Sequence, residues 1–430
     1  MDIKEIYDLF RKSGSITTDS RQIGEGTMFF ALKGATFDGN TFVAEAFAKG
    51  ASYCVIDNPQ YCLNDRCILV DNVLQTMQQL ATYHRRQFQI PVLAITGTNG
   101  KTTTKELVTA VLRKRYRTHA TQGNFNNHLG VPITLLTMPL DTQIAVVEMG
   151  ANHPGEIDFL CHIAEPDFGL ITNVGKAHLE GFGSFEGVIN TKTELYRYLA
   201  GKGGQVFVNA DDEILMQHSQ SLRHVTYGQA ADADAKGSYV GANPYMKFYF
   251  ENGDNVYSVQ TNLLGGYNLA NAMAAVCVGK HFGVELFDIK EALEAYTPTN
   301  SRSQLKQTER NNLFLDCYNA NPSSMKAAVE NFGNMHCSNA VVMLGGMREL
   351  GPTSEQEHRN VVEMVRSFGF SKMVFVGEEF AFVKGLADNV LWFATSQDAK
   401  QYFVDNPLND CTILIKGSNS TKMGELVESL

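Results

Sequence analysis

Residues 90–103 read Ile-Pro-Val-Leu-Ala-Ile-Thr-Gly-Thr-Asn-Gly-Lys-Thr-Thr. An apolar run leads into a glycine-rich turn, and a helical pattern follows from Lys101. Such a unit holds phosphate, because glycines let backbone N–H groups approach the anion and the helix N-terminus adds a positive dipole end. In this arrangement Lys101 reaches the β- and γ-phosphates, and the Thr102 hydroxyl is a ligand for Mg²⁺.

The loop is a shortened form of the P-loop. The usual form has four residues between its first glycine and Gly-Lys, and Ile95 stands here where that first glycine would be. The strand before the loop and the helical pattern after it still predict nucleotide binding. The alternative is a glycine-rich turn with a solvent-facing lysine. The predicted nucleotide-binding residues are Gly97, Thr98, Asn99, Gly100, Lys101, Thr102 and Thr103.

Composition limits the classes of protein to consider. A chain of 430 residues with 44% hydrophobic and 19% charged residues is typical of a globular protein of two or three domains. Its net charge of −10 argues against a nucleic-acid partner. The eight cysteines form no Cys-x-x-Cys pair, and we expect reduced thiols and a cytoplasmic location. No apolar stretch reaches the membrane-spanning length and no signal-peptide pattern opens the chain, so we expect no membrane insertion.

The sequence pattern predicts an α/β fold with three domains. Residues 1–88 hold short apolar runs and end in a helical stretch, which indicates a smaller N-terminal α/β domain. Residues 89–298 alternate strand and helix patterns, as in a central P-loop domain with a parallel sheet. Beyond the Pro-Thr-Asn-Ser-Arg stretch at 298–302, residues 299–430 repeat the alternation, which predicts a Rossmann-like C-terminal domain. The central pattern has strands near 92–95, 144–148 and 169–174, and helices near 102–113, 155–162 and 185–199.

Polar residues at strand ends are candidates for a site, because ligands of such sheets sit at the carboxyl ends of the strands. Glu148 ends an apolar strand and is placed either to bind Mg²⁺ or to cap the next helix. His178 follows the strand near 169–174, where a lone histidine is more often a satisfied polar group than a ligand. Asp316 ends a strand of the third domain, with an Asx turn and helix cap as the alternative role.

Lys192 falls in an apolar stripe. Phe185, Val188, Leu195 and Leu199 have the spacing of one helical face, and Lys192 occupies the missing position. A lysine on a buried face is costly unless it is paired or chemically changed. Periodicity alone favours the ordinary alternative, a partly buried lysine whose ammonium extends to water.

Together these segments resemble the Mur ligase family, the ATP-dependent amide-forming enzymes of peptidoglycan precursor synthesis. The resemblance covers nearly the whole chain, and its motifs occur in the family's order. It is strongest to the members that add D-alanyl-D-alanine, because sister ligases tend to have a histidine-containing motif in place of residues 316–322. The matching segments are 18–21, 29–34, 37–39, 97–103, 122–132, 148–152, 155–157, 173–192, 266–271 and 316–322.

The resemblance implies a reaction. A ligase of this type joins D-alanyl-D-alanine to UDP-N-acetylmuramoyl-tripeptide through an acyl phosphate, with ATP and two Mg²⁺ ions, and it acts as a monomer. Catalysis would involve Lys101, Glu148, His178 and Lys192, with Lys192 carbamylated. Thr102, Glu148, His178 and Lys192 would hold the metals. Asn268, Asn271, Arg302 and Asp316 would join the loop in binding ATP, and Ser20, Arg21, Asn126, Asn127, Tyr318, Asn319 and Asn321 would bind the other substrates.

Two positions depart from the family pattern. Gly346 stands where an acidic residue is common, and Asn419 stands where arginine is common. Both lie in the last domain, on the acceptor side, and neither belongs to the nucleotide or metal residues. The alternative functions are a related ligase that adds one amino acid, a folylpolyglutamate synthase, and a non-catalytic binding protein whose domains close on ATP.

Overall fold

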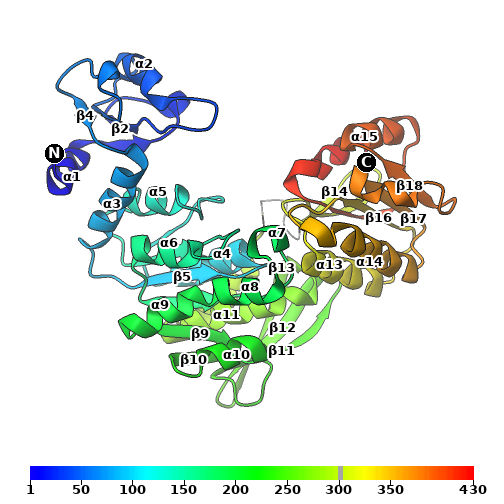
Figure 1. The fold of residues 1–430 in the computed structure, drawn as a ribbon. Helices are drawn as coiled ribbons and strands as arrows, with labels where there is room; N and C mark the ends of the chain where they lie inside the picture. The colour runs from blue at the N-terminus through cyan, green and yellow to red at the C-terminus, as the bar shows by residue number, and fades with distance from the viewer. Residues whose placement is uncertain (299–303) are drawn as a thin grey trace.

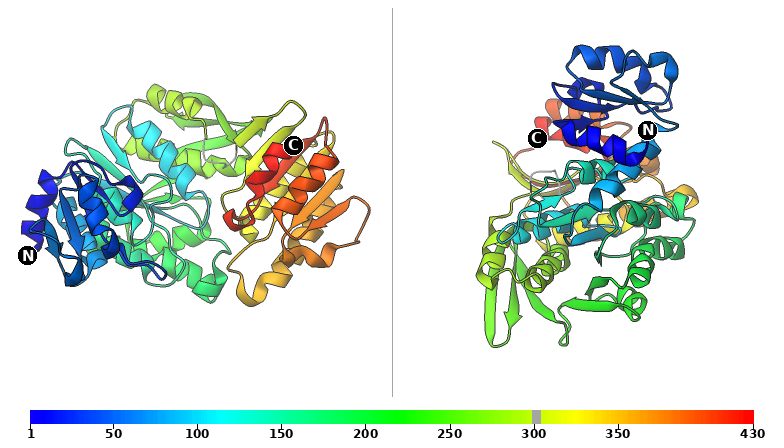
Figure 2. Two further views of the ribbon diagram at one scale, coloured as in Figure 1. Left: turned by 90° about the horizontal axis from the view of Figure 1, so that it is seen from above. Right: turned by 90° about the vertical axis from the view of Figure 1, so that its left-hand side faces the viewer.

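The structure, a computed structural model, describes residues 1–298 and 304–430. The chain forms three α/β units, each built on its own sheet, with the first and third at opposite ends of the middle one (Figures 1 and 2). The predicted α/β class, with a central P-loop unit, is confirmed. The candidate Arg302 and nearly all of the expected 298–302 boundary lie outside the described residues. Within the described residues, no helix is both long and apolar enough to cross a membrane.

The first unit is a small parallel sheet with three helices. Its strands run in the order β1-β2-β3-β4 and all pair in parallel. Helix α3 begins where the Asn72 side chain accepts a hydrogen bond from the Gln75 N–H, and it packs against α1 and against helices of the middle unit. The elements are α1 (Ile3–Lys12), β1 (Ser15–Thr17), β2 (Thr27–Phe30), α2 (Val43–Ala48), β3 (Tyr53–Ile56), β4 (Cys67–Leu69) and α3 (Val73–Arg85).

The middle unit has a nine-stranded sheet in the order β13-β12-β11-β10-β9-β8-β5-β7-β6. From β6 to β11 neighbouring strands pair in parallel, whereas β11, β12 and β13 form an antiparallel edge. The strands are β5 (Val92–Thr96), β6 (Thr118–Ala120), β7 (Ile144–Glu148), β8 (Phe168–Ile171), β9 (Gln205–Asn209), β10 (Arg223–Gly228), β11 (Ala235–Ala242), β12 (Tyr245–Asn252) and β13 (Asn255–Leu264).

Helices cover both faces of the middle sheet. Alternate residues of β5 point to opposite faces: Leu93 and Ile95 pack with α4 and α11, whereas Val92 and Ala94 pack with the helices of the other face. This apolar run on both faces is typical of a parallel strand buried between helices. The helices are α4 (Lys101–Leu112), α5 (Gly130–Leu136), α6 (Glu156–Ala164), α7 (Leu179–Phe182), α8 (Phe185–Lys192), α9 (Glu194–Lys202), α10 (Glu213–Ser219), α11 (Leu269–His281) and α12 (Leu286–Ala295).

Two local features differ from the sequence expectation. The antiparallel edge was not predicted, although the Asn252-Gly253 dipeptide between β12 and β13 is typical of a hairpin turn. The single helix expected over residues 185–199 is two helices that meet at Thr193. The break places the Glu194 carboxylate to accept hydrogen bonds from the Gly155 and Asp158 N–H groups, and it leaves Lys192 at the end of α8.

The third unit has a six-stranded sheet in the order β14-β15-β19-β16-β17-β18. Only the β14–β15 pair is antiparallel. Helices α13 and α14 pack on one face and α15 on the other. The elements are β14 (Gln304–Gln307), β15 (Asn312–Asp316), α13 (Pro322–Asn334), β16 (Ala340–Gly345), α14 (Ser354–Ser367), β17 (Lys372–Val376), β18 (Val390–Phe393), α15 (Ser396–Asp405) and β19 (Thr412–Lys416).

Arg85, at the end of α3, fastens the first unit to the middle one. Its guanidinium forms an ion pair with Asp167 at 2.9 Å and donates to the carbonyls of Ala164 and Phe88. The Arg85 side chain is only 8% exposed, whereas its neighbour Arg86, paired with Glu165, is 61% exposed. The two arginines therefore make similar ion pairs with one loop at very different depths.

We expect Arg85→Met to lower the free energy of unfolding by about 2–3 kcal/mol, because the change leaves Asp167 and two carbonyls without their buried partner. Arg86→Met should cost about 0.5 kcal/mol, since an exposed pair contributes little. Urea unfolding followed by circular dichroism measures both variants. Equal losses in the two would contradict the importance of the buried pair.

Candidate functional site

A cavity of about 670 Å³ lies between the middle and third units. The loop after β5, the end of β7 and the start of α11 form one wall, and the end of β15 with the start of α13 forms the opposite wall. The first unit contributes no lining residue, so Ser20 and Arg21 lie away from this cavity. Arg21 is highly exposed and pairs with Asp19 at 2.7 Å.

The loop after β5 has the backbone that the sequence predicts for a phosphate cradle. Gly97 has a φ of 139°, and a Cβ there would come within 2.0 Å of the Thr172 hydroxyl. Gly100 has a φ of 77° and immediately precedes α4, and a Cβ there would come within 2.5 Å of Asn271 Oδ1. Both positions therefore require glycine. Asn173 supports the loop from β8, because it accepts the Thr98 and Asn99 N–H groups.

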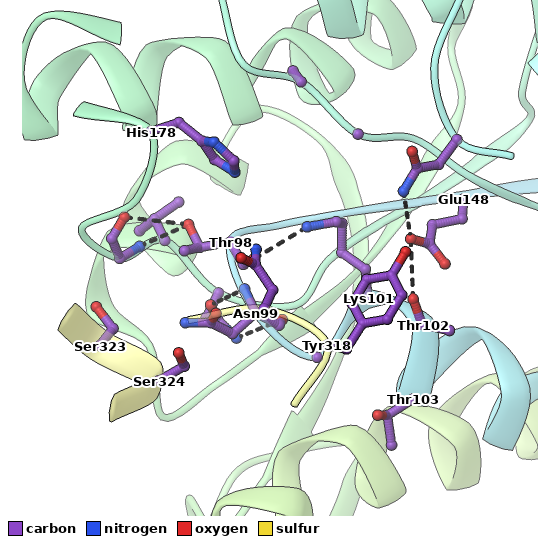
Figure 3. Close-up of a pocket in the computed structure, with 18 of the residues that line it drawn as sticks. Thr98, Asn99, Lys101, Thr102, Thr103, Glu148, His178, Tyr318, Ser323 and Ser324 are labelled. Atoms are coloured by element: carbon purple, nitrogen blue, oxygen red, sulfur yellow. Dashed lines mark hydrogen bonds between the residues drawn. The ribbon is translucent and has the colours of Figure 1, made fainter. Parts of the chain in front are cut away.

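Lys101 begins α4 and folds back over the loop (Figure 3). Its Nζ donates to the carbonyls of Gly97 at 2.9 Å and Thr98 at 3.1 Å. The ammonium therefore sits at the cavity wall beside the first turn of the helix, where the backbone N–H groups have no partner within the helix. A positive side chain, a helix N-terminus and a glycine-rich backbone together form a site for phosphate.

Glu148 faces this loop from the end of β7. The carboxylate is 1% exposed, and its Oε1 accepts hydrogen bonds from the Thr102 hydroxyl at 3.2 Å and the Asn126 amide at 2.8 Å (Figure 3). Its Oε2 is buried without a hydrogen bond among the described residues, and Lys105 Nζ lies 3.9 Å away. Within residues 1–298 and 304–430, this carboxylate makes no hydrogen bond to the start of α6, whereas Glu194 does.

These oxygens fit a magnesium ion. The Thr102 and Glu148 oxygens are 3.2 Å apart, close to the separation of about 3 Å between neighbouring ligands in an octahedron with bonds of about 2.1 Å. Among the described residues, no group of three or more His, Cys, Asp or Glu side chains could hold a metal alone. This donor set therefore suits an ion that takes its other ligands from phosphate and water, as Mg²⁺ does.

Lys192 is buried behind the cavity wall. The side chain is 2% exposed, so it does not extend to water, and Nζ donates to the Ala151 carbonyl at 3.3 Å. It also lies 5.3 Å from the centre of the Phe182 ring. Burial holds the pKa of the Lys192 ammonium well below its usual range, and the charge of Lys101 adds to this effect.

His178 lines the cavity just before α7, with a φ of 50°. Its ring packs edge-on against Phe182, which is also the ring beneath Lys192. Its Nδ1 is hydrogen bonded to the Glu349 carboxylate of the third unit. Burial lowers the pKa of His178, and the Glu349 carboxylate opposes that shift.

Asn268 and Asn271 line the cavity near α11 and hold the P-loop helix through hydrogen bonds. The Asn268 amide donates to the Leu264 carbonyl and accepts from Asn271, whose own oxygen accepts from Thr104. This network ties the start of α11 to α4. Two further amide candidates, Asn126 and Asn127, come from the segment before α5. Asn126 donates to Glu148, as described above, and Asn127 accepts the N–H groups of Leu129 and Gly130 at the start of α5.

The third unit brings six polar residues to the cavity: Asp316, Tyr318, Asn319, Ser323, Ser324 and Lys416. The buried Lys416 ammonium pairs with Asp316 at 2.5 Å and donates to the Asn319 carbonyl. Asn321 caps α13 by accepting the Ser324 N–H, and its amide donates to Asn99 Oδ1 at 2.8 Å. Asn321 is therefore already joined to the phosphate loop across the two units.

One of the two departures from the family pattern, Gly346, has a structural explanation. A Cβ at that position would come within 2.7 Å of Glu379 Oε2, and Glu379 forms an ion pair with Arg348 at 2.7 Å. The Glu379 carboxylate thus occupies the space that a side chain at position 346 would need. Arg348 also donates to the hydroxyl of Ser420, next to Asn419.

Sequence reasoning missed four residues that hold the site: Lys105, Asn173, Glu194 and Glu349. Lys105 lies one helical turn after Lys101, and Asn173 lies near the end of a predicted strand, so periodicity and strand position were available signals for these two. Glu194 and Glu349 act across the fold, and no local pattern marks them.

Comparison with known proteins supplies a family. Residues 13–93 match the model "Mur ligase family, catalytic domain", 95–279 match "Mur ligase middle domain", and 301–419 match "Mur ligase, glutamate ligase domain". The chain is 35% identical to the UDP-N-acetylmuramoyl-tripeptide--D-alanyl-D-alanine ligase of Bacillus subtilis, over 96% of this chain and 92% of the relative.

Two solved structures extend this likeness. MurF from Acinetobacter baumannii superposes with a TM-score of 0.88 at 30% identity, covering 100% of this chain and 98% of that one. The MurF ligase from Thermotoga maritima in complex with ADP superposes with a TM-score of 0.85 at 26% identity, covering 98% and 97%.

We expect Lys101→Ala to bind MgATP about 10- to 100-fold more weakly than the unchanged protein, because a charge-assisted hydrogen bond contributes about 1.5–3 kcal/mol. Isothermal titration calorimetry measures the affinity. Lys114→Ala is the control: this lysine follows the same helix but pairs with Glu291 on the surface. Unchanged ATP affinity in the Lys101 variant would contradict the phosphate-binding role.

Proposed function

The chain belongs to the Mur ligase family, and we propose that it joins D-alanyl-D-alanine to UDP-N-acetylmuramoyl-tripeptide, with cleavage of ATP to ADP and phosphate. One observation carries this proposal: the phosphate loop and the Asp316–Asn321 segment face each other across one cavity. The reaction needs that arrangement, because the phosphate of ATP must meet a carboxylate and then an amine.

The chemistry has two steps. A carboxylate oxygen of the tripeptide attacks the γ-phosphorus of ATP, and the bond from that phosphorus to the bridging oxygen of ADP breaks. The amine of the dipeptide then attacks the carbonyl of the acyl phosphate and loses a proton as phosphate departs. Catalysis of phosphoryl transfer consists mainly of positioning and compensation of negative charge. Lys101 and the first turn of α4 supply that charge here.

Magnesium would bind at Thr102 and Glu148, where it would neutralise charge on the phosphate oxygens. A second ion would be held or positioned by His178 and by Lys192 in carbamylated form. The loop Gly97–Thr103 would hold the phosphates, and Asn268 and Asn271 would contact the adenine or ribose side. Asp316 and Arg302 would complete the nucleotide contacts from the third unit.

The other substrates would extend from the same cavity. Asn126 and Asn127 would lie along the tripeptide, and Ser20 and Arg21 would contact the UDP part on residues 1–88. Tyr318, Asn319 and Asn321 would bind the incoming dipeptide on residues 299–430, while residues 89–298 bind ATP. We expect the protein to act as a monomer, and the eight cysteines, none of them in a disulfide, favour the cytoplasm.

We expect D-alanyl-D-alanine to be a much better acceptor than any single amino acid, because polar groups built around a dipeptide stay unpaired when a smaller amine binds. A phosphate-release assay with ATP, a set of UDP-muramoyl peptides and a set of amines measures this preference. Phosphate should appear only when the peptide and the amine are both present.

The same assay separates the alternatives. Use of lysine or glutamate in place of the dipeptide would assign the chain to a sister ligase, and use of a folate would assign it to the folylpolyglutamate synthases. ATP binding without phosphate release under any combination would indicate a protein whose domains close on ATP without catalysis.

We expect Lys192 to react with CO₂. Burial lowers the pKa of its ammonium and so favours the neutral amine, whose nitrogen lone pair can form a bond to the carbon of CO₂ with loss of one proton. The resulting carbamate offers two hard oxygen ligands of the kind that Mg²⁺ prefers. Mass measurement under mild conditions should find an additional CO₂ on the unchanged protein.

Lys192→Ala should keep the fold but lose most activity, and acetate should restore part of it by filling the space with an anion. Lys202→Ala, a partly exposed lysine on the next helix that pairs with Asp167, serves as the control and should retain activity. An unmodified Lys192 together with a fully active Lys192→Ala variant would contradict the carbamate.

A further inference from the structure

Glu349 connects the third unit to the middle unit beside the cavity. It lies in the segment between β16 and α14, and its carboxylate is hydrogen bonded to Nδ1 of His178. Its backbone carbonyl accepts the Glu180 N–H at 3.2 Å. Two hydrogen bonds from one residue therefore hold the start of α7, which carries His178 at its N-terminal end.

The segment that carries Glu349 is itself fixed. The buried His358 of α14 accepts the Met347 N–H at 3.0 Å and is bonded through Nδ1 to the Ser354 carbonyl. Leu350 is buried in the core of the third unit, on the other side of Glu349. Glu349 thus lies on a turn that is held from both sides, and its carboxylate has a defined position relative to the third sheet.

A carboxylate constrains the histidine chemically. An ionised carboxylate only accepts hydrogen bonds, so Nδ1 of His178 carries the proton of the neutral ring, and Nε2 keeps its lone pair. Figure 3 shows the His178 ring directed toward the region of the cavity that holds Lys101. A histidine that is oriented by a carboxylate through its other nitrogen is the usual arrangement for a ring that binds a metal or accepts a proton.

We propose that Glu349 is a positioning residue, which fixes the tautomer and direction of the His178 ring from across the interface between the two units. This rests on the function proposed above. Because Glu349 belongs to the third unit and His178 to the middle unit, the contact exists only while the third unit is docked. Docking therefore brings the end of β15 and the start of α13 to the cavity and orients His178 in a single event.

The other polar contacts described between the two units do not involve the His178 ring. Lys176 pairs with Glu357 of α14 at 3.0 Å, and its backbone N–H donates to Ser323 of α13. Asn99 and Asn321 join the phosphate loop to α13. Loss of the Lys176 side chain removes one docking ion pair but neither side chain of the His178–Glu349 contact, so with the third unit held in place by bound nucleotide it is a matched control.

The direct test is the nitrogen-15 NMR signature of the His178 ring, assigned with a His178→Gln variant. It uses the full chain saturated with a non-hydrolysable ATP analogue at a pH where the ring is neutral. We expect the Nδ1–H tautomer in the unchanged protein and in Lys176→Met, but a shift toward Nε2–H in Glu349→Ala. Glu349→Gln should keep Nδ1–H, since the amide oxygen still accepts. An Nε2–H ring in the unchanged protein, or an unchanged ring in Glu349→Ala, would overturn the proposal.

Kinetics give an independent readout. Glu349→Ala should lower kcat about 10- to 100-fold, which is the usual cost of removing a group that orients a histidine, with KM for ATP nearly unchanged. Glu349→Gln should recover most of the loss, and Glu355→Gln, on the exposed face of α14, should behave as the unchanged protein. A raised KM for the acceptor with unchanged kcat in Glu349→Ala would instead assign Glu349 to docking alone. The NMR signature needs no turnover, so failure of the proposed ligase reaction would be recognised separately.

Discussion

The rest of the structure depends on one constraint: the chain must bring its backbone against a highly charged phosphate. Gly97 and Gly100 satisfy it, because the space that side chains would need there is already filled by Thr172 and Asn271. Those two residues come from the ends of other elements, so the loop fixes how β8 and α11 approach β5. The polar layer around the loop, with Thr104, Asn268 and Asn173, follows from that approach. Stability and phosphate binding thus rely on the same contacts.

Beside the cavity, the interface between the middle and third units is polar, and this suits a reaction that excludes water and then releases products. Its contacts there are hydrogen bonds and ion pairs, such as Asn99–Asn321, Lys176–Glu357 and His178–Glu349. Farther along the interface, Leu264 of β13 packs into the apolar core of the third unit. Polar contacts of this kind are weak individually in water and strengthen when water is excluded. Substrates that fill the cavity exclude water and so strengthen these contacts. Substrate binding therefore stabilises the docked third unit and completes the site.

Local sequence patterns predict the elements of this molecule whose conformation depends on residues close together in the chain. The strand–loop–helix at 90–112, the parallel strands of the third unit and the position of Glu148 follow from apolar runs, glycines and strand ends. The β11–β13 edge was missed because one of its faces is exposed and its residues alternate, so no continuous apolar run marks it. The break at Thr193 was missed because it depends on Glu194 reaching the start of α6, a contact about 40 residues back along the chain. Glu349 was missed for the same reason, as its partner is 171 positions away.

Two of the residues assigned to chemistry conflict with a stable fold. A buried lysine and a buried carboxylate oxygen without a hydrogen bond both cost free energy in the protein alone, and here they are Lys192 and Glu148. Both lie beside or just behind the cavity wall, where a carbamate would replace the Lys192 ammonium and a metal ion would compensate the negative charge of the carbamate and of Glu148. Ligands that bind the folded chain and not the unfolded one stabilise it by mass action. The cost of these buried groups would thus be offset when the site is filled, and the same burial would strengthen the charges that act on the transferred phosphoryl group.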